Sequence, residues 1–178
     1  MKPCLLVIDA QEAFVQEGLY QKDVMVKNIQ ALEDTCRQKD VEVIFICHNT
    51  KKFTKQSKGW NVYPAIAPME GESVIEKWYN SAFKDTELLE YLDERSIDTL
   101  IICGLQSEYC IDTTCKVAFE YGLDVYIGKD CTSTFDQKDL TAAQITAFYE
   151  NNIWKDRFAK VIEMDELLKM LENLQNES

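Results

Sequence analysis

Residues 98–124 read DTLIICGLQSEYCIDTTCKVAFEYGLD, a pattern that predicts a strand, a tight turn and a helix in succession. The apolar run from Leu100 to Cys103 is long enough for one buried strand, and Gly104 interrupts it. Beyond the turn, apolar residues follow helical spacing until Gly122, which favours a helix end: Ile111, Cys115, Ala118 and Phe119. This unit predicts an α/β fold in which the rest of the chain is arranged around it.

Cys110 stands at the first turn of the expected helix. Free amide N–H groups and the helix dipole favour an anion at that position, so the thiol pKa is expected to be lowered and the sulfur to be a good nucleophile. The alternative is that Cys110 is a small apolar core residue. That interpretation suits the five cysteines that lie in apolar runs or on apolar faces: Cys4, Cys36, Cys47, Cys103 and Cys115.

Strand and helix patterns alternate along the remaining chain. Strands are expected at 3–9, 41–47, 73–76, 100–103, 123–128 and 158–162. Helices are expected at 24–39, after Asp85, from Cys110, at 139–152 and at 164–174, and residues 175–178 are expected to fray. This alternation predicts one α/β domain over residues 1–178, with a doubly wound, mostly parallel six-stranded sheet and helices on both faces.

Composition narrows the classes of function. The chain has 178 residues and a net charge of −12, which argues against nucleic acid as a partner. No apolar run approaches the ~20 residues of a membrane span, and no signal-peptide pattern is seen at the N-terminus. Seven cysteines without a disulfide-like spacing predict a reducing, cytoplasmic setting.

Three chemical groups far apart in the sequence are expected to meet at one edge of the sheet. Asp9 ends the first strand, Lys77 ends the third, and Cys110 follows the fourth. Asp9 would serve as general base and acid, Lys77 would supply a cation that favours the thiolate, and Cys110 would be the nucleophile. Considered alone, Asp9 could equally be a turn or cap residue. Lys77 alone could be an exposed lysine at the end of a strand.

Segments carrying these residues resemble the isochorismatase-like cysteine hydrolase family, which includes nicotinamidases and N-carbamoyl amidases. They are LLVIDAQEAF (5–14), VIEK (74–77) with SAF (81–83), and CGLQSEYC (103–110). The resemblance implies a catalytic triad of Asp9, Lys77 and Cys110. It also implies a cis peptide bond between Leu105 and Gln106, with the N–H groups of Gln106 and Cys110 directed at an oxyanion.

The sequence departs from the family pattern at two places. Metal-dependent nicotinamidases carry an Asp-x-His type cluster after the second strand, where this chain reads HNTKK (48–52). His48 is the sole histidine, so neither a catalytic metal nor any other cofactor is expected. Some relatives carry a His-His-Asn run where this chain has FYE (148–150). The resemblance therefore implies hydrolysis of a small amide or related C–N bond through a thioester at Cys110, with nicotinamide disfavoured.

Residues 51–72 lack periodicity and are expected to form a long excursion over the sheet edge, as a lid or an interface. We predict that four residues line a substrate pocket: Phe14, Trp60, Ser107 and Tyr109. Trp60 equally suits an aromatic anchor that pins the excursion to the core. The expected partner is a small molecule, and relatives of this kind suggest a homodimer or homotetramer.

Two other functions remain as alternatives. The chain could be a non-catalytic binding or assembly module that keeps the fold, as the altered positions 48–52 and 148–150 would allow. Redox chemistry between Cys103 and Cys110 is the weaker alternative, because the chain has no Cys-x-x-Cys motif.

Overall fold

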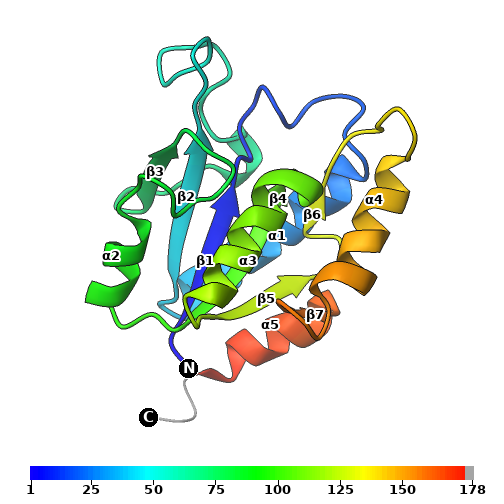
Figure 1. The fold of residues 1–178 in the computed structure, drawn as a ribbon. Helices are drawn as coiled ribbons and strands as arrows, with labels where there is room; N and C mark the ends of the chain where they lie inside the picture. The colour runs from blue at the N-terminus through cyan, green and yellow to red at the C-terminus, as the bar shows by residue number, and fades with distance from the viewer. Residues whose placement is uncertain (175–178) are drawn as a thin grey trace.

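A parallel sheet forms the centre of the computed structural model, which describes residues 1–174 (Figure 1). Residues 175–178, for which fraying is expected, lie outside the described part. The strand order is β3-β2-β1-β4-β5-β7, and β6 pairs with β4. The strands are β1 Pro3–Ile8, β2 Glu42–His48, β3 Ser73–Lys77, β4 Thr99–Leu105, β5 Asp124–Gly128, β6 Thr132–Ser133 and β7 Lys160–Ile162.

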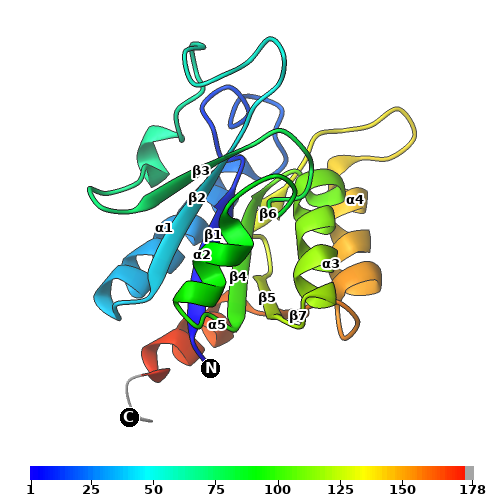
Figure 2. The same ribbon diagram turned by 60° about the vertical axis from the view of Figure 1, so that its left-hand side comes forward.

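The sheet has seven strands rather than the expected six, because the two-residue β6 is too short to show a sequence period. The predicted α/β class, parallel pairing and two covering layers are confirmed. The α-helices are α1 Lys22–Gln38, α2 Leu88–Glu94, α3 Asp112–Glu120, α4 Ala142–Phe148 and α5 Met164–Glu172, and a 3-10 turn spans Pro64–Ile66. Helices α1 and α5 pack on one face of the sheet, and α2 and α3 pack on the other (Figures 1 and 2).

Strand β1 lies in the middle of the sheet between β2 and β4, and every residue of it is buried. Its side chains alternate between the two cores: Leu5 and Val7 pack with α1, whereas Leu6 and Ile8 pack with α2 and α3. A strand buried on both faces needs a continuous apolar run, which explains the sequence of residues 3–8.

The strand order reverses between β1 and β4, which places a crevice beyond the carboxyl ends of these two strands. Ile8, the last residue of β1, pairs with Ile46 of β2 and with Gly104 of β4. Strands β2 and β4 continue only to His48 and Leu105, so the chain leaves all three strands at the same edge of the sheet. The segments that follow β1 and β2 rise above this edge in both views (Figures 1 and 2).

Two helices differ from the sequence prediction because each contains a π-helical turn. Ser107–Ile111 is π-helical and leads into α3, and the Ile111 N–H donates to Gln106 O at 3.2 Å. The helix expected at 139–152 begins instead with a capping box at Thr141, and it passes from α4 into the π-helical stretch Tyr149–Trp154. The 3.6-residue apolar period of a helix does not distinguish such turns from α-helix.

None of the described helices combines the length and the apolar character that crossing a bilayer requires.

Candidate active site

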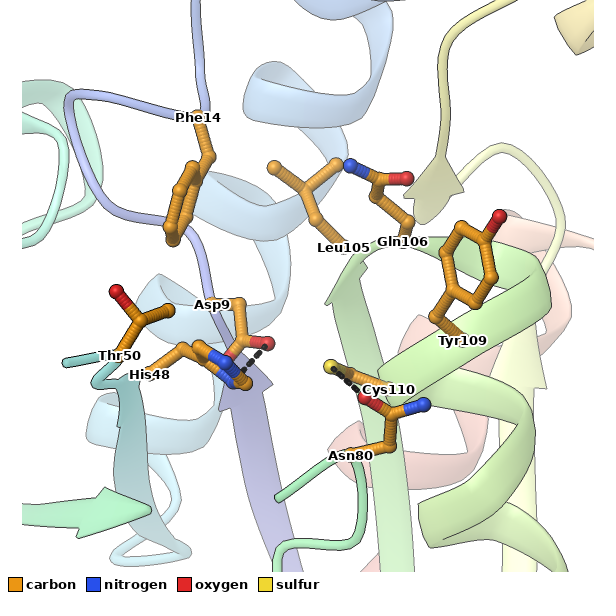
Figure 3. A pocket seen from close by; sticks show the side chains of 9 residues that line it. All are labelled: Asp9, Phe14, His48, Thr50, Asn80, Leu105, Gln106, Tyr109 and Cys110. Atoms are coloured by element: carbon orange, nitrogen blue, oxygen red, sulfur yellow. Dashed lines mark hydrogen bonds and ion pairs between the residues drawn. The ribbon is translucent and has the colours of Figure 1, made fainter. Parts of the chain in front are cut away.

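A cavity of about 250 Å³ opens in the crevice between β1 and β4 (Figure 3). The segments after β1, β2, β3 and β4 all contribute to its wall. Its lining residues are Asp9, Phe14, His48, Thr50, Asn80, Leu105, Gln106, Tyr109 and Cys110. Two of the three residues predicted to carry the chemistry thus face one cavity.

Lys77, the third of them, lies directly behind the cavity wall and is fully buried. Its Nζ lies 2.9 Å from Asp9 Oδ2, 2.8 Å from His48 Nδ1, 3.1 Å from Cys110 Sγ and 3.1 Å from Tyr79 O. The structure therefore brings Asp9, Lys77 and Cys110 together around one ammonium group. A buried charge is tolerated when it is paired and hydrogen-bonded in this way.

Asp9 follows β1 with a positive φ of 52°, and its N–H donates to Ile46 O of β2 at 2.9 Å. One carboxylate oxygen, Oδ2, accepts from Lys77, whereas the buried Oδ1 has no hydrogen-bond partner among the described residues. A carboxylate oxygen of Asp9, a ring nitrogen of His48 and the sulfur of Cys110 all lie within 4.8 Å of one another. The carboxylate thus lies near the sulfur and keeps one buried oxygen without a partner among the described residues.

The thiol of Cys110 behaves differently from the sequence prediction. Burial raises its pKa to about 12, with the negative charge of Asp9 acting in the same direction and Lys77 in the opposite one. The expected lowering of the pKa is therefore wrong for the resting site, because burial beside a carboxylate outweighs the helix start and the ammonium. The thiol lies 3.9 Å from Asn80 Oδ1, which can accept its proton in a weak hydrogen bond (Figure 3).

His48 is a site residue that no sequence motif indicates. It ends β2, pairs in register with Lys77 of β3, and lines the cavity. Burial and the charge of Lys77 lower the pKa of His48, so the imidazole is neutral at neutral pH. Its Nδ1 then accepts from Lys77, which leaves the proton on Nε2. The sequence feature that could indicate His48 is its position at the end of the strand that pairs with β1.

Donor atoms of Asp9, His48 and Cys110 are close enough to hold a metal ion. However, Lys77 Nζ lies within hydrogen-bond distance of all three side chains and supplies the positive charge at that point. A metal bound to these three atoms would lie against the ammonium group, and like charges at that distance repel strongly. This donor set does not fit a metal ion.

The four residues predicted to line a pocket divide into two pairs. Phe14 and Tyr109 line the cavity with Cys110. Trp60 is only 3% exposed, does not line this cavity, and donates from Nε1 to Asn49 Oδ1 at 2.7 Å. Ser107 is buried beneath the wall and donates to Thr132 Oγ1 at 3.0 Å. Trp60 is thus placed as an anchor, which was the alternative interpretation.

The excursion 51–72 is tied to the segment that follows β1. Ala13 N–H donates to Gly59 O, and Tyr63 N–H donates to Ala10 O. No residue of the excursion lines the cavity, but Phe53 packs against Phe14 with ring centroids 5.2 Å apart. The excursion therefore supports the cavity wall from outside.

Replacing Trp60 by Phe should lower the free energy of unfolding by ~1–3 kcal/mol, because the buried Asn49 Oδ1 loses its donor. Denaturant titration would measure this loss. Because Trp60 does not touch the cavity, kcat/KM should stay within about threefold of wild type. A variant of normal stability but much lower kcat/KM would contradict the anchor role.

The wall that carries Gln106 belongs to the turn between β4 and the π-helical segment. The Leu105–Gln106 peptide bond is cis, at the place the resemblance implies. Gln106 O accepts from Tyr109 N–H at 3.1 Å and from Ile111 N–H at 3.2 Å. Thr50, Asn80 and Leu105 complete the lining and were not selected from sequence, because each lies at a strand end or in a connection without a motif of its own.

Comparison with known proteins identifies the family to which this chain belongs. The model of the isochorismatase domain family matches residues 3–166, and the chain belongs to that family. The chain is 29% identical over 177 residues to the isochorismatase family protein YrdC of Bacillus subtilis, covering 94% of this chain and 95% of the relative. It is 27% identical over 184 residues to Nicotinamidase 3 of Arabidopsis thaliana, a match that covers 94% of this chain and 87% of the relative.

Among solved structures, an isochorismatase of Pseudomonas putida KT2440 has a TM-score of 0.85 and 33% identity. That match covers 93% of this chain and 89% of the other. Isochorismatase family members are hydrolases, so the protein is an enzyme of the hydrolase class.

Proposed function

We propose that the protein hydrolyses a small amide or a related C–N bond through a thioester at Cys110. Asp9 is the general base and then the general acid, and Lys77 is the supporting cation. The observation that carries this proposal is the position of Lys77 Nζ, 2.9 Å from the Asp9 carboxylate and 3.1 Å from the Cys110 sulfur beside an open cavity.

The proton that the mechanism moves lies on the Cys110 sulfur in the resting site. Because burial and the Asp9 charge raise the pKa of the Cys110 thiol to about 12, the sulfur keeps its proton at neutral pH. Moving that proton from sulfur to the Asp9 carboxylate creates a thiolate without changing the net charge. Lys77 touches both groups and stabilises the negative charge on whichever of them carries it.

In the first half-reaction the Cys110 thiol gives its proton to Asp9, and the sulfur electron pair forms a C–S bond to the substrate carbonyl. The tetrahedral intermediate collapses as the C–N bond breaks, and protonated Asp9 gives the proton to the leaving nitrogen. A thioester and a free amine or ammonia result. In the second half-reaction Asp9 takes a proton from water, and the hydroxide attacks the thioester carbonyl. The C–S bond then breaks, the carboxylic acid product leaves, and protonated Asp9 returns its proton to the Cys110 sulfur.

Backbone N–H groups of Gln106 and Cys110 are proposed to bind the oxyanion of the tetrahedral intermediates. Both residues line the cavity, with most of the π-helical turn between them. Two backbone N–H groups held in place and directed at the developing negative charge commonly stabilise such an intermediate.

An amide as substrate is consistent with Nicotinamidase 3, a relative named for an amide. Nicotinamide itself is not proposed, because HNTKK stands where metal-dependent nicotinamidases carry an Asp-x-His type cluster, and Lys77 leaves no place for a metal among Asp9, His48 and Cys110. We further propose a cytoplasmic homodimer or homotetramer without nucleic-acid or membrane partners. All seven cysteines are free thiols, as in a reducing compartment, and exposed aromatic side chains such as Trp78 and Phe119 are available for an interface.

The test is a panel of small primary amides and ureido compounds, scored by release of ammonia from wild type and from Cys110→Ala. Turnover of at least one compound by wild type and of none by the variant supports the proposal. Equal turnover by both proteins contradicts it. No turnover by wild type, with Cys110 unreactive to alkylation, would favour the non-catalytic binding or assembly module.

Replacing Asp9 by Asn should separate the two roles of its carboxylate. We expect kcat/KM to fall by at least ~10³-fold, because no group then accepts and returns the proton. We also expect the pKa of Cys110 to fall below its wild-type value of about 12, since the raising charge is gone and the lowering charge of Lys77 remains. The pH dependence of Cys110 alkylation would measure the second effect.

Glu12→Gln is the matched control for that variant. It removes the same formal charge from an exposed position three residues along the chain. It should leave both kcat/KM and the alkylation profile unchanged. A lower thiol pKa in both variants would mean that overall charge, rather than the local carboxylate, governs the sulfur.

A further inference from the structure

The charges around the cavity limit what kind of substrate it can accept. Apart from Cys110 and the Tyr109 phenol, the ionisable side chains that line it are Asp9 and His48. The other polar lining groups are neutral: the hydroxyls of Thr50 and Tyr109 and the amides of Asn80 and Gln106. Phe14 and Leu105 form the apolar part of the wall (Figure 3).

The Lys77 ammonium behind the wall is already fully engaged. It has three N–H donors, and four protein acceptors lie within 3.1 Å of Nζ. Its side chain is fully buried, and its charge is balanced by Asp9 at 2.9 Å. It therefore has neither a spare donor nor an unbalanced charge for an anionic substrate.

His48 does not supply a positive charge either. Its Nδ1 lies 2.8 Å from Lys77 Nζ, and two N–H donors do not face each other at that distance, so Nδ1 is an acceptor and the ring is neutral. The lowered pKa of His48 has the same consequence. Its Nε2–H remains a neutral donor.

Charges just outside the lining do not supply the positive charge that the lining lacks. Lys51 and Lys52 follow Thr50, but both are exposed and neither lines the cavity. Near Gln106, the Thr134 hydroxyl lies 3.4 Å from Gln106 Oε1 and donates to Glu108 Oε1 at 2.8 Å, so a carboxylate and not a cation lies on that side of the wall. The whole chain carries −12.

We propose that the substrate is uncharged at the part that enters the cavity, so that the enzyme selects neutral amides over amides that carry a carboxylate. This inference rests on the proposed function, because it names the class of amide that the proposed hydrolysis would act on. A carboxylate entering the cavity would lose water without gaining a cationic partner, whereas a carboxamide of the same shape finds neutral hydrogen-bond partners.

The first test uses a matched pair of reagents on Cys110 itself. Iodoacetamide and iodoacetate differ in carboxamide against carboxylate, and both alkylate thiols. The other six cysteines have 0% exposure, whereas Cys110 opens to the cavity, so intact mass reports its alkylation in the native protein. The ratio of the two rate constants is compared with the ratio for N-acetylcysteine.

We expect that ratio to exceed the free-thiol ratio by at least about tenfold in favour of iodoacetamide, and to persist in roughly 0.5 M salt, where long-range fields are screened. A ratio similar to that of the free thiol, or one that favours iodoacetate, overturns the inference. A preference that disappears in salt overturns it too, because it would then arise from the net charge and not from the cavity.

Thr50→Arg and Thr50→Gln provide the matched variants. Thr50 lines the cavity, and either substitution lengthens the side chain, but only Arg adds a positive charge. The ratio should move toward the free-thiol value in Thr50→Arg and stay near the wild-type value in Thr50→Gln. Equal ratios in the two variants would contradict the charge argument.

A second test compares turnover of succinamide and succinamate, which differ in one terminal group, after correction for the two equivalent amides of succinamide. We expect kcat/KM to favour succinamide, and a preference for succinamate overturns the inference. A high alkylation ratio together with no turnover of any amide would support the charge selectivity of the cavity while refuting the proposed hydrolysis. The two hypotheses therefore fail separately.

Discussion

Replacing Cys110 by Ala should lower kcat/KM by at least ~10⁴-fold, because the sulfur is the atom that forms the covalent bond in the proposed mechanism. The loss should appear in kcat, since the cavity wall otherwise remains intact. Steady-state release of ammonia from an active amide measures it. The melting temperature should change little, because the side chain loses a single heavy atom at the edge of a cavity.

Cys110→Ser is the companion variant. It keeps the approximate size of the side chain and the contact with Lys77 Nζ, but it substitutes a hydroxyl whose pKa lies far above that of a thiol. We expect a loss of similar order in this variant. Retention of kcat/KM within about tenfold of wild type in Cys110→Ala would show that the cysteine is not the nucleophile.

Replacing Gly104 by Ala should destabilise the protein by at least ~4 kcal/mol, in the range reserved for severe backbone conflicts. Gly104 has a φ of +115°, which side chains rarely adopt, and an added Cβ would lie 2.0 Å from Ile8 O. That oxygen belongs to the backbone of the central strand β1 and cannot rotate away. Chemical denaturation would measure the loss.

Gly122→Ala is the matched control for this prediction. Gly122 also has a positive φ, of +80°, but an added Cβ would meet no atom of the described residues within 4 Å. Its substitution should cost only about 1–2 kcal/mol, from backbone strain alone. Equal costs at the two positions would mean that the close approach of β4 to β1 contributes nothing.

The architecture followed well from local sequence patterns. The apolar runs expected to form strands at 3–9 and 100–103 are buried in β1 and β4, so they identify buried parallel strands. The expected break at Gly104 is wrong, because β4 continues through Gly104 to Leu105. The π-helical turns and the two-residue β6 did not follow. Their hydrogen-bond pattern depends on packing between segments distant in sequence, and no local period records it.

The candidate site was partly predictable for the same reason. Asp9, Lys77 and Cys110 follow from strand ends that must meet at one edge, together with a family resemblance. His48 was missed because a single strand-end histidine looks the same whether it faces Lys77 or solvent. Trp60 was ambiguous because an aromatic residue in a long excursion can point toward the cavity or, as here, toward Asn49.

The thiol pKa shows most clearly what sequence alone could not provide. A helix start predicts a lowered pKa, and that effect is real but small. Burial of Cys110 beside the Asp9 carboxylate raises the pKa instead, and only coordinates reveal both. In the proposed mechanism this is useful, because the proton stays within the pair until a substrate carbonyl is present.

The most direct test of covalent catalysis by Cys110 is the intact mass of the enzyme, quenched in acid during turnover of an active amide. We expect a mass increase equal to the acyl group of the substrate, mapped by peptide analysis to Cys110 and absent from Cys110→Ala. Rapid turnover by wild type with no adduct on Cys110 at any quench time, together with undiminished turnover by Cys110→Ala, would contradict it.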